Sequence, residues 1–251
     1  MAGHSKWANR VHRKTRQDAK RSKLFAKLSR QIIVAAREGG PDPDKNARLR
    51  LAIEAARAAS MPMENIEHAI KRGSGQIEGA QYEHATFEGY GPGGAALMID
   101  VLTDNRQRTL SEIRHILRSA GGSLGEAGCV TWLFEPKGII VVPRGQTDEE
   151  ELFLAAVEAG AEDIVEEDDY FEIQTAPQDF QKVLDAVRQV GAEPERAEVT
   201  MVPTSTTPVS DEDAPKLLRL LNALEEHDDV QHVYSNFEIS DEVLDRIESE
   251  E

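Results

Sequence analysis

Cysteine, aromatic residues and long apolar runs are all scarce in this chain. Its 251 residues include one cysteine, Cys129, so no disulfide can form within the chain. No stretch approaches the roughly 18 apolar residues of a membrane span. The first ten residues, MAGHSKWANR, lack the apolar segment of a signal peptide. These absences exclude the secreted, disulfide-stabilised and membrane-spanning classes, and we expect a cytoplasmic protein in a reducing compartment.

The charge of the chain is divided very unevenly between its two ends. The net charge is −17, and hydrophobic residues make up 39% of the chain, as in globular proteins. Residues 1–79 hold 17 Lys/Arg and 8 Asp/Glu, a net charge of +9. Residues 80–251 hold 12 Lys/Arg and 38 Asp/Glu, a net charge of −26. This asymmetry indicates one end suited to a polyanion and a remainder that repels it.

Apolar periodicity predicts that the basic end is entirely helical. A first helix is expected over residues 14–38, where the Gly-Gly-Pro sequence that follows would end it. A second is expected over 43–59 and a third over 62–72, with Gly73 at its C-terminal cap position. Residues 73–75 then read as a linker.

Beyond the linker the pattern changes to short strands with intervening helices. Strands are predicted at 82–90 and 95–102, joined by the turn Gly91-Pro-Gly-Gly94. A helix follows, capped by Asp104 or Asn105, and then a glycine-rich loop at 121–128. The remaining predicted elements of this set are a strand at 129–134, a helix at 214–226 and a strand at 232–239.

Residues 138–202 contain a second series in the order β-α-β-β-α-β, which is the ferredoxin-like order. Its predicted strands are 139–142, 163–166, 170–174 and 197–202, and its predicted helices are 149–159 and 180–190.

The sequence therefore predicts an α+β protein with three domains: an N-terminal helical bundle and two α+β domains, one inserted in the other. The expected boundaries are 1–79 for the helical domain, 80–135 plus 205–240 for a discontinuous middle domain, 136–204 for the inserted ferredoxin-like domain, and 241–251 for an acidic tail.

The first predicted helix carries a row of cations on one face. At about 100° per residue, the row falls within one arc, and the apolar residues occupy a separate arc. It consists of Arg13, Arg16, Lys20, Lys23, Lys27, Arg30 and Arg37. Such a row suits a phosphate backbone. The alternative is a solvated face, but solvated faces usually alternate in charge, whereas residues 1–37 hold 11 Lys/Arg and a single acid. We therefore expect nucleic-acid binding here.

A polar segment with one large aromatic side chain precedes that row. It comprises Lys6, Trp7, Arg10, His12, Arg13 and Lys14. A tryptophan beside cations suits stacking on an unpaired base. The same tryptophan could instead anchor the segment to its own domain, and the residues leave this choice open.

A second contact surface is suggested at the start of the helix that follows Thr103. Arg106 and Arg108 lie where free backbone N–H groups would converge, which suits a phosphate or carboxylate. The glycine-rich sequence at 121–126 could add to this surface. In the alternative interpretation, Asp104 simply caps the helix and the arginines are solvated.

Enzyme-like features carry little weight. The loop at 87–94 lacks the Lys-Ser/Thr of a phosphate-binding loop and joins two strands, so it reads as a tight turn. His4 and His12 have no metal cluster or orienting carboxylate in the pattern. Cys129 is expected to be a buried, inert thiol in a strand, and residues 162–169 lack the spacing of a calcium loop. No catalytic, cofactor-binding or metal-binding residue is predicted.

Several longer motifs resemble the YebC/PmpR family. They are MAGHSKWAN at 1–9, HRK at 12–14, DAKR at 18–21, VAAREGG at 34–40, NI at 65–66, AIKRG at 69–73, GYGPGG at 89–94, LTDNR at 102–106, GG at 121–122, LGE at 124–126 and YSN at 234–236. The departures are small: Arg10-Val11, Ser22 and Ser60 stand where the family usually has other residues. None of them removes a cation from the first helix.

The resemblance implies a three-domain cytoplasmic protein without enzymatic activity or cofactor. Members of the family are described chiefly as DNA-binding transcriptional regulators, and others as ribosome-associated factors that assist translation through proline-rich stretches. Both roles need a polyanion-binding end. Cations alone favour contacts with the backbone over base readout, which also suits structured ribosomal RNA. We expect a nucleic-acid-binding regulator of gene expression whose partner is DNA or ribosomal RNA, with the ribosome as a possible assembly and no membrane. An adaptor whose acidic domains bind a basic protein is a third alternative.

Overall fold

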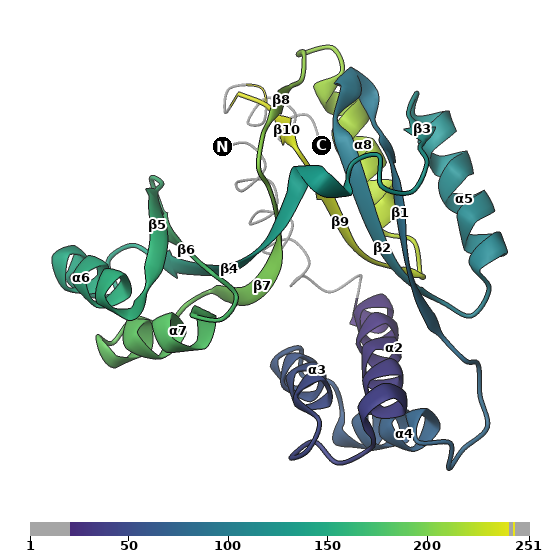
Figure 1. Ribbon diagram of the computed structural model, residues 1–251, viewed down its shortest axis with the longest axis horizontal. Helices are drawn as coiled ribbons and strands as arrows, with labels where there is room; N and C mark the ends of the chain where they lie inside the picture. The colour runs from purple at the N-terminus through teal and green to yellow at the C-terminus, as the bar shows by residue number, and fades with distance from the viewer. Residues whose placement is uncertain (1–20, 241–242, 244–251) are drawn as a thin grey trace. The chain divides into compact units, whose positions relative to one another are not determined.

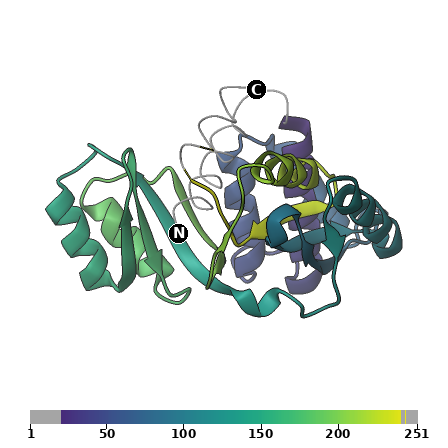
Figure 2. The same ribbon diagram turned by 90° about the horizontal axis from the view of Figure 1, so that it is seen from above.

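The computed structural model of the chain describes residues 21–240 and residue 243, and it divides into two compact units. One unit contains the chain up to Thr131 and from Ser205 onward, and the other is Trp132–Thr204 (Figure 1, Figure 2). The first unit combines an N-terminal region of three described helices with an antiparallel sheet and its two helices, and the second is built on another antiparallel sheet. The predicted α+β class is therefore confirmed. No helix among the described residues is long and apolar enough to cross a membrane.

Three helices open the first unit and enclose a small apolar core. They are α2 (Arg21–Gly39), α3 (Ala47–Ala58) and α4 (Met63–Gly73). The core is made by Ile32, Leu49 and Ile66, each at most 1% exposed, with smaller residues around them. We call this part the helical region.

The ends of α3 and α4 correct the predicted bounds. Helix α3 begins at Ala47 rather than near residue 43 because Asp42 forms a turn with Asp44 and Lys45. Asn46 then caps the helix, since its side-chain oxygen accepts the N–H of Leu49. Gly73 is not a C-terminal cap but the last helical residue: a Cβ there would lie 2.4 Å from the carbonyl oxygen of Ile33 on α2. The left-handed backbone conformation belongs to Gly75, at φ +78°.

The sheet of the first unit has the strand order β3-β1-β2-β9 and is antiparallel throughout. Its strands are β1 (Glu83–Tyr90), β2 (Ala96–Thr103), β3 (Ser123–Leu124) and β9 (Val230–Ser235). Helices α5 (Arg106–Ser119) and α8 (Ala214–Glu225) cover one face (Figure 1). Leu97, Ile113 and Leu217 are fully buried between the sheet and these helices. As predicted, the short 3₁₀ turn η1 (Pro92–Gly94) joins β1 to β2.

Residues 129–134 do not form the predicted strand. They contain a turn and the 3₁₀ helix η2 (Thr131–Leu133), and the third strand of the sheet is β3 instead. The reason is the carboxylate of Glu88, which accepts the N–H groups of Gly128, Val130 and Thr131 at 2.6–2.9 Å. These donors would otherwise serve a neighbouring strand. Cys129 is accordingly half-buried in this turn, and burial, followed by the charge of Glu88, raises the pKa of its thiol.

The predicted strand at 232–239 is divided at Asn236. Its side-chain oxygen accepts the N–H of Ala96 on β2, and its amide nitrogen donates to Thr207. Beyond this point β10 (Phe237–Glu238) leaves the main sheet and pairs in parallel with β8 (Thr207–Pro208).

The second unit has the strand order β5-β6-β4-β7, with all neighbours antiparallel, as in a ferredoxin-like fold. Its elements are β4 (Phe134–Pro143), α6 (Glu149–Ala159), β5 (Ala161–Glu166), β6 (Tyr170–Thr175), α7 (Phe180–Gln189) and β7 (Arg196–Pro203). Both helices pack on the same face of the sheet, around Ile140, Leu152 and Val183. The first strand is longer than predicted, because its half from Phe134 to Gly138 continues the pairing with β7.

Candidate nucleic-acid interface

Part of the predicted basic surface lies outside the described residues. This applies to Lys6, Trp7, Arg10, His12, Arg13, Lys14, Arg16 and Lys20. The structure does describe the rest of the row on α2, namely Lys23, Lys27, Arg30 and Arg37.

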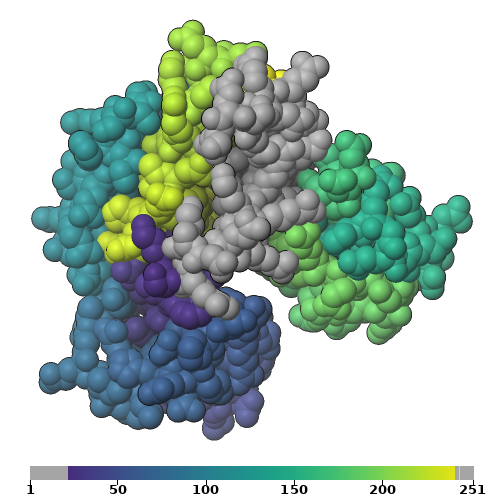
Figure 3. Space-filling model, turned by 180° about the vertical axis from the view of Figure 1, so that it is seen from behind, coloured from purple at the N-terminus to yellow at the C-terminus, as the bar shows by residue number. Residues whose placement is uncertain are grey.

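Two lysines of α2 contact the C-terminal end of α8. The Nζ atom of Lys27 donates to the carbonyl oxygen of Glu225 at 2.8 Å and lies 3.7 Å from its carboxylate. The Nζ atom of Lys23 donates to the carbonyl oxygen of Glu226 at 3.2 Å. The last carbonyls of a helix have no partner within the helix and lie at the negative end of its dipole. Figure 3 shows the purple atoms of α2 against the yellow atoms of this part of the chain.

Arg30 and Lys27 are the most enclosed of the four row cations that the structure describes. The side chain of Arg30 is 15% exposed, Nη2 lies 3.4 Å from Oδ1 of Asp229, and the guanidinium lies 5.4 Å from the ring centre of Tyr82. Its Nη1 atom is buried without a hydrogen-bond partner among the described residues. Arg37, one end of the row, is exposed and donates to the carbonyl oxygen of Tyr82. The two arginines thus hold the chain that leads from the helical region into β1.

Asp229 connects the helical region to α5. Its side chain is 4% exposed and accepts hydrogen bonds from Thr109 at 2.6 Å and from Arg108 at 2.7 Å. Burial acts to raise the pKa of this carboxyl group. The hydrogen bonds from Thr109 and Arg108, with the positive charges of Arg30 and Arg108, outweigh burial and hold the pKa below its usual value. Asp229 is therefore ionised at neutral pH and shared by two arginines.

The two arginines predicted as a second contact surface have different surroundings. Arg108 pairs with Asp104 at 2.9 Å as well as with Asp229, so carboxylates already surround its charge. Arg106 is exposed and lies over the ring of Phe87, 5.9 Å from its centre. The helix cap is Asn105, whose side chain accepts the N–H of Arg108, so Asp104 is free to pair with the Arg108 side chain.

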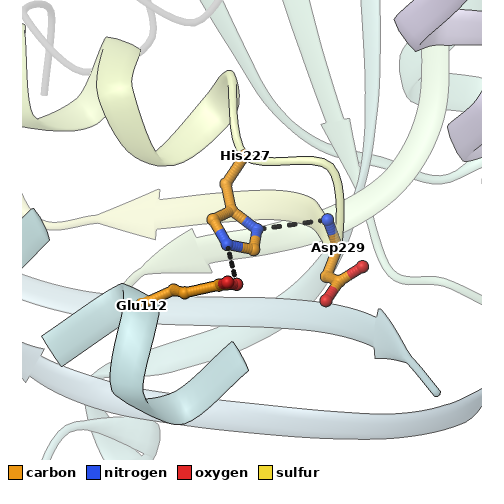
Figure 4. Close-up of side chains that lie close together, drawn as sticks. All are labelled: Glu112, His227 and Asp229. Atoms are coloured by element: carbon orange, nitrogen blue, oxygen red, sulfur yellow. Dashed lines mark hydrogen bonds and ion pairs between the residues drawn. The ribbon is translucent and has the colours of Figure 1, made fainter. Parts of the chain in front are cut away.

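Glu112, His227 and Asp229 bring three possible metal-ligand atoms within 4.8 Å of one another (Figure 4). The ring of His227 is held at both nitrogens: Nε2 lies 3.0 Å from Glu112, and Nδ1 accepts the backbone N–H of Asp229 at 3.1 Å. This arrangement assigns the ring proton to Nε2. A metal ion here would lie beside the guanidinium groups of Arg30 and Arg108, which also contact Asp229. The trio is better explained as a hydrogen-bonded link between α5 and the start of β9.

A hollow of about 800 Å³ lies between α2, α5 and the segment after α8. Its basic residues are Lys23, Arg30 and Arg108, and its acids are Asp104, Glu112, Glu226, Asp228 and Asp229. The acids outnumber the cations, so Lys23 and Arg30, the two cations of the row that line this hollow, lie among carboxylates of their own chain. The run Glu225-Glu226-His227-Asp228-Asp229 in the sequence is the signal that could have indicated this partner.

Comparisons with known proteins agree with this architecture over nearly the whole chain. Residues 5–76 match the model of the TACO1/YebC protein N-terminal domain, and residues 82–237 match that of the TACO1/YebC second and third domain. A protein of Persephonella marina is 53% identical over 249 residues, covering 98% of this chain and all of its own. One of Halothermothrix orenii is 53% identical over 253 residues, covering the whole of both chains. Both are named "Probable transcriptional regulatory protein".

A solved structure is similar as well. The crystal structure of a conserved hypothetical protein from Aquifex aeolicus has a TM-score of 0.81 and 51% identity, covering 90% of this chain and 94% of its own. Two family models and full-length relatives at more than half identity leave no ambiguity, and the chain belongs to the TACO1/YebC family.

Proposed function

We propose that this protein is a non-enzymatic regulator of gene expression that binds DNA through the basic face of its helical region. The observation that carries the proposal is the separation of charge, with +9 on residues 1–79 and −26 on residues 80–251. Helix α2 alone has five Lys/Arg and one acid. A concentrated basic region in an acidic chain favours binding to phosphates at one place and repels them elsewhere.

The contacts of α2 indicate which cations are most available to a phosphate. Lys23 is exposed and is hydrogen-bonded to a backbone carbonyl, and Arg37 is exposed and likewise bonded to a carbonyl. Among the described residues neither has an ion pair, so neither has to exchange a carboxylate for a phosphate. Lys27 and Arg30 would have to give up Glu225 and Asp229. Lys27 and Arg30 are about equally enclosed, but Glu225 is 27% exposed and Asp229 only 4%, so water can replace the cation at Glu225 more readily and the exchange costs less at Lys27.

DNA is favoured as the partner because the full-length relatives carry the name of transcriptional regulators. The cations of α2 are lysines and arginines, which contact phosphates and carry no base sequence by themselves. The same chemistry would serve structured ribosomal RNA in a translation factor. Crosslinking in living cells, with sequencing of recovered DNA and RNA, separates the two. Promoter DNA enriched in a shared motif supports the proposal, and discrete ribosomal RNA positions with featureless DNA contradict it.

A binding measurement tests the face itself. The double variant K23E/R37E replaces the two cations of the row that, among the described residues, have no carboxylate partner. We expect about tenfold or weaker binding to a labelled DNA duplex, and a salt dependence of log K reduced by about 2. The matched control is K182E/R188E on α7, which makes the same change in charge at exposed residues of the other unit. Equal binding by wild type and K23E/R37E would contradict the proposal.

A further inference from the structure

The acidic part of the chain concentrates its few cations on two packed helices. Residues 80–251 contain 12 Lys/Arg, and six of these lie on α5 and α8. They are Arg106, Arg108, Arg114, Arg118, Lys216 and Arg219. The same helices carry two acids, Glu112 and Glu225. In a stretch with a net charge of −26, these helices therefore form a positive exception.

Three of these arginines have no acid partner in the part of the chain that the structure describes. Arg114, Arg118 and Arg219 are exposed, and among the described residues none of the three takes part in a hydrogen bond or ion pair of its side chain. By contrast, most of the other arginines that the structure describes in this acidic part are paired, as Arg108 is with Asp229 and Arg144 with Glu149. Acids are abundant in this part of the chain, yet three arginines on two packed helices lie without an ion pair among the described residues, whereas α7 of the other unit has a single such arginine, Arg188.

Between the two helices lies a groove of about 670 Å³. Its polar side chains are those of His115, Ser119, Lys216 and Arg219, and the other lining residues are apolar, with no Asp or Glu among them. This α5–α8 groove thus differs from the acid-rich hollow beside α2. The two adjoin, because His115 and Ile116 line both. The α5–α8 groove therefore lies beside the hollow that Lys23 and Arg30 of α2 line.

Simpler explanations account for single residues but not for the set. Arg118 lies in the last turn of α5, where a cation is favourable at the negative end of the helix dipole. Arg114 lies a turn earlier, and Arg219 lies in the middle of α8, so the dipole explains neither. Lys216 pairs with Asp213 at 3.0 Å and with Glu212 at 3.4 Å, but these neighbours on its own helix turn form surface pairs that are readily exchanged.

We propose that the α5–α8 groove, with Arg114 and Arg118 beside it, is a second phosphate-binding surface that contacts the backbone of the DNA held by α2. This inference rests on the proposed function. Arginine offers two parallel N–H donors to a phosphate, and Arg219 at the groove donates to no group among the residues that the structure describes. The exposed Arg114 and Arg118 extend the surface along α5, which suits a ligand that runs on beyond the groove rather than a small anion enclosed by it.

The test is a titration of a labelled DNA duplex with the full-length variant R118E/R219E at several salt concentrations. We expect about tenfold weaker binding and a salt dependence of log K that falls by about 2, because two phosphate contacts are lost. The control K182E/R188E makes the same change in charge on α7 and is expected to bind as wild type does. The milder R118Q/R219Q removes the charge without reversing it and is expected to show the same loss of slope. This second variant keeps the test valid if the reversed charges disturb folding.

The outcomes separate this inference from the proposed function. If R118E/R219E and R118Q/R219Q bind DNA as the control does while K23E/R37E is weakened, the second surface is wrong and the proposed function stands. If all of these variants bind as wild type does, both fail. The same set is titrated with an RNA hairpin. A loss of binding confined to RNA would overturn the assignment to DNA. Polyglutamate at equal charge concentration tests an acidic polypeptide as the alternative ligand. If it displaces the duplex from the wild type but not from R118E/R219E, the surface binds acidic polypeptides and the assignment to DNA is wrong.

Discussion

Arg30 on α2 and Asp229 before β9 form an ion pair whose nearest atoms are 3.4 Å apart, with the acid 4% exposed and the arginine 15% exposed. The pair joins the helical region to the segment that follows α8. The same carboxylate accepts the hydroxyl of Thr109 and the guanidinium of Arg108. One acid thus fixes two helices and neutralises part of the surface that we assign to DNA, so its removal should change both stability and binding.

Replacing Asp229 with asparagine is expected to destabilise the protein by about 2 kcal/mol. The loss arises because Arg30 is left enclosed without its counter-charge and Thr109 and Arg108 lose a charged acceptor. On the proposed function, the freed Arg30 should also raise the affinity for a DNA duplex severalfold. Urea unfolding and fluorescence anisotropy measure the two effects.

Asp228→Asn is the matched control for this variant. Asp228 is the next residue along the chain, it is exposed, and its replacement removes the same charge. We expect a change in stability below about 0.5 kcal/mol and a smaller gain in affinity than for Asp229→Asn. Equal effects of the two substitutions would show that overall charge, not the Arg30–Asp229 pair, governs binding.

Glu88→Gln is expected to destabilise the turn at 128–131. It should also make the free energy of unfolding fall less between neutral and acidic pH than it does in the wild type. Burial acts to raise the pKa of Glu88, but the backbone N–H groups of Gly128, Val130 and Thr131 outweigh it, and the pKa is lowered in the folded state. A depressed pKa contributes stability that is complete above the unfolded pKa of about 4.3 and is lost as the pH falls through the folded value. The amide of glutamine is uncharged and has a single acceptor oxygen, so it cannot replace the carboxylate as acceptor of all three N–H groups. We therefore expect the free energy of unfolding to fall by about 2 kcal/mol at pH 7.

The measurement is the urea midpoint as a function of pH between 3 and 7 for wild type, Glu88→Gln and Glu126→Gln. Glu126 is an exposed neighbour in the same loop, with no side-chain hydrogen bond among those the structure describes. We expect its variant to follow the wild-type curve, whereas the curve of Glu88→Gln should be flatter below pH 4.3. If the urea midpoint of Glu88→Gln fell below about pH 4.3 as steeply as that of the wild type, other carboxylates would supply the pH dependence.

Local signals predicted helices such as α6 well, because everything that defines it is near in sequence. Asp148 caps it by accepting the N–H of Glu151, and Gly160 ends it at φ +107°. The turn at 128–131 could not be predicted in this way, since its acceptor, Glu88, comes from a strand 40 residues earlier. Short-range periodicity contains no information on such a partner.

The basic row presents the same limit at the candidate site. Its cations were evident from their spacing, but the acids that meet Lys27 and Arg30 belong to a segment about 200 residues further along the chain. The second contact surface, Arg106 and Arg108, was likewise predicted from the pattern of charge alone, which does not reveal the acids that pair with Arg108. Arg108 pairs with Asp229, whereas Arg114 and Arg118, on the same helix, have no ion pair among the described residues. The sequence located the positive helix, and tertiary pairing decides which of its arginines can meet a ligand.

Gly73→Ala is expected to destabilise the helical region by about 2 kcal/mol, although alanine favours an isolated helix by about 1 kcal/mol over glycine. The added Cβ would lie 2.4 Å from the backbone oxygen of Ile33 and 2.8 Å from the Cβ of Ala36, so α4 must move away from α2 and lose packing. Gly79→Ala is the control, because its Cβ would meet only the flexible end of Arg72. Thermal unfolding followed by circular dichroism compares the two.

Since α2 is held by α4 on one side and by the Glu225–Asp229 segment on the other, we also expect Gly73→Ala to weaken DNA binding. A variant as stable as wild type would mean that α2 and α4 can separate without cost, and that the basic face does not depend on their close approach.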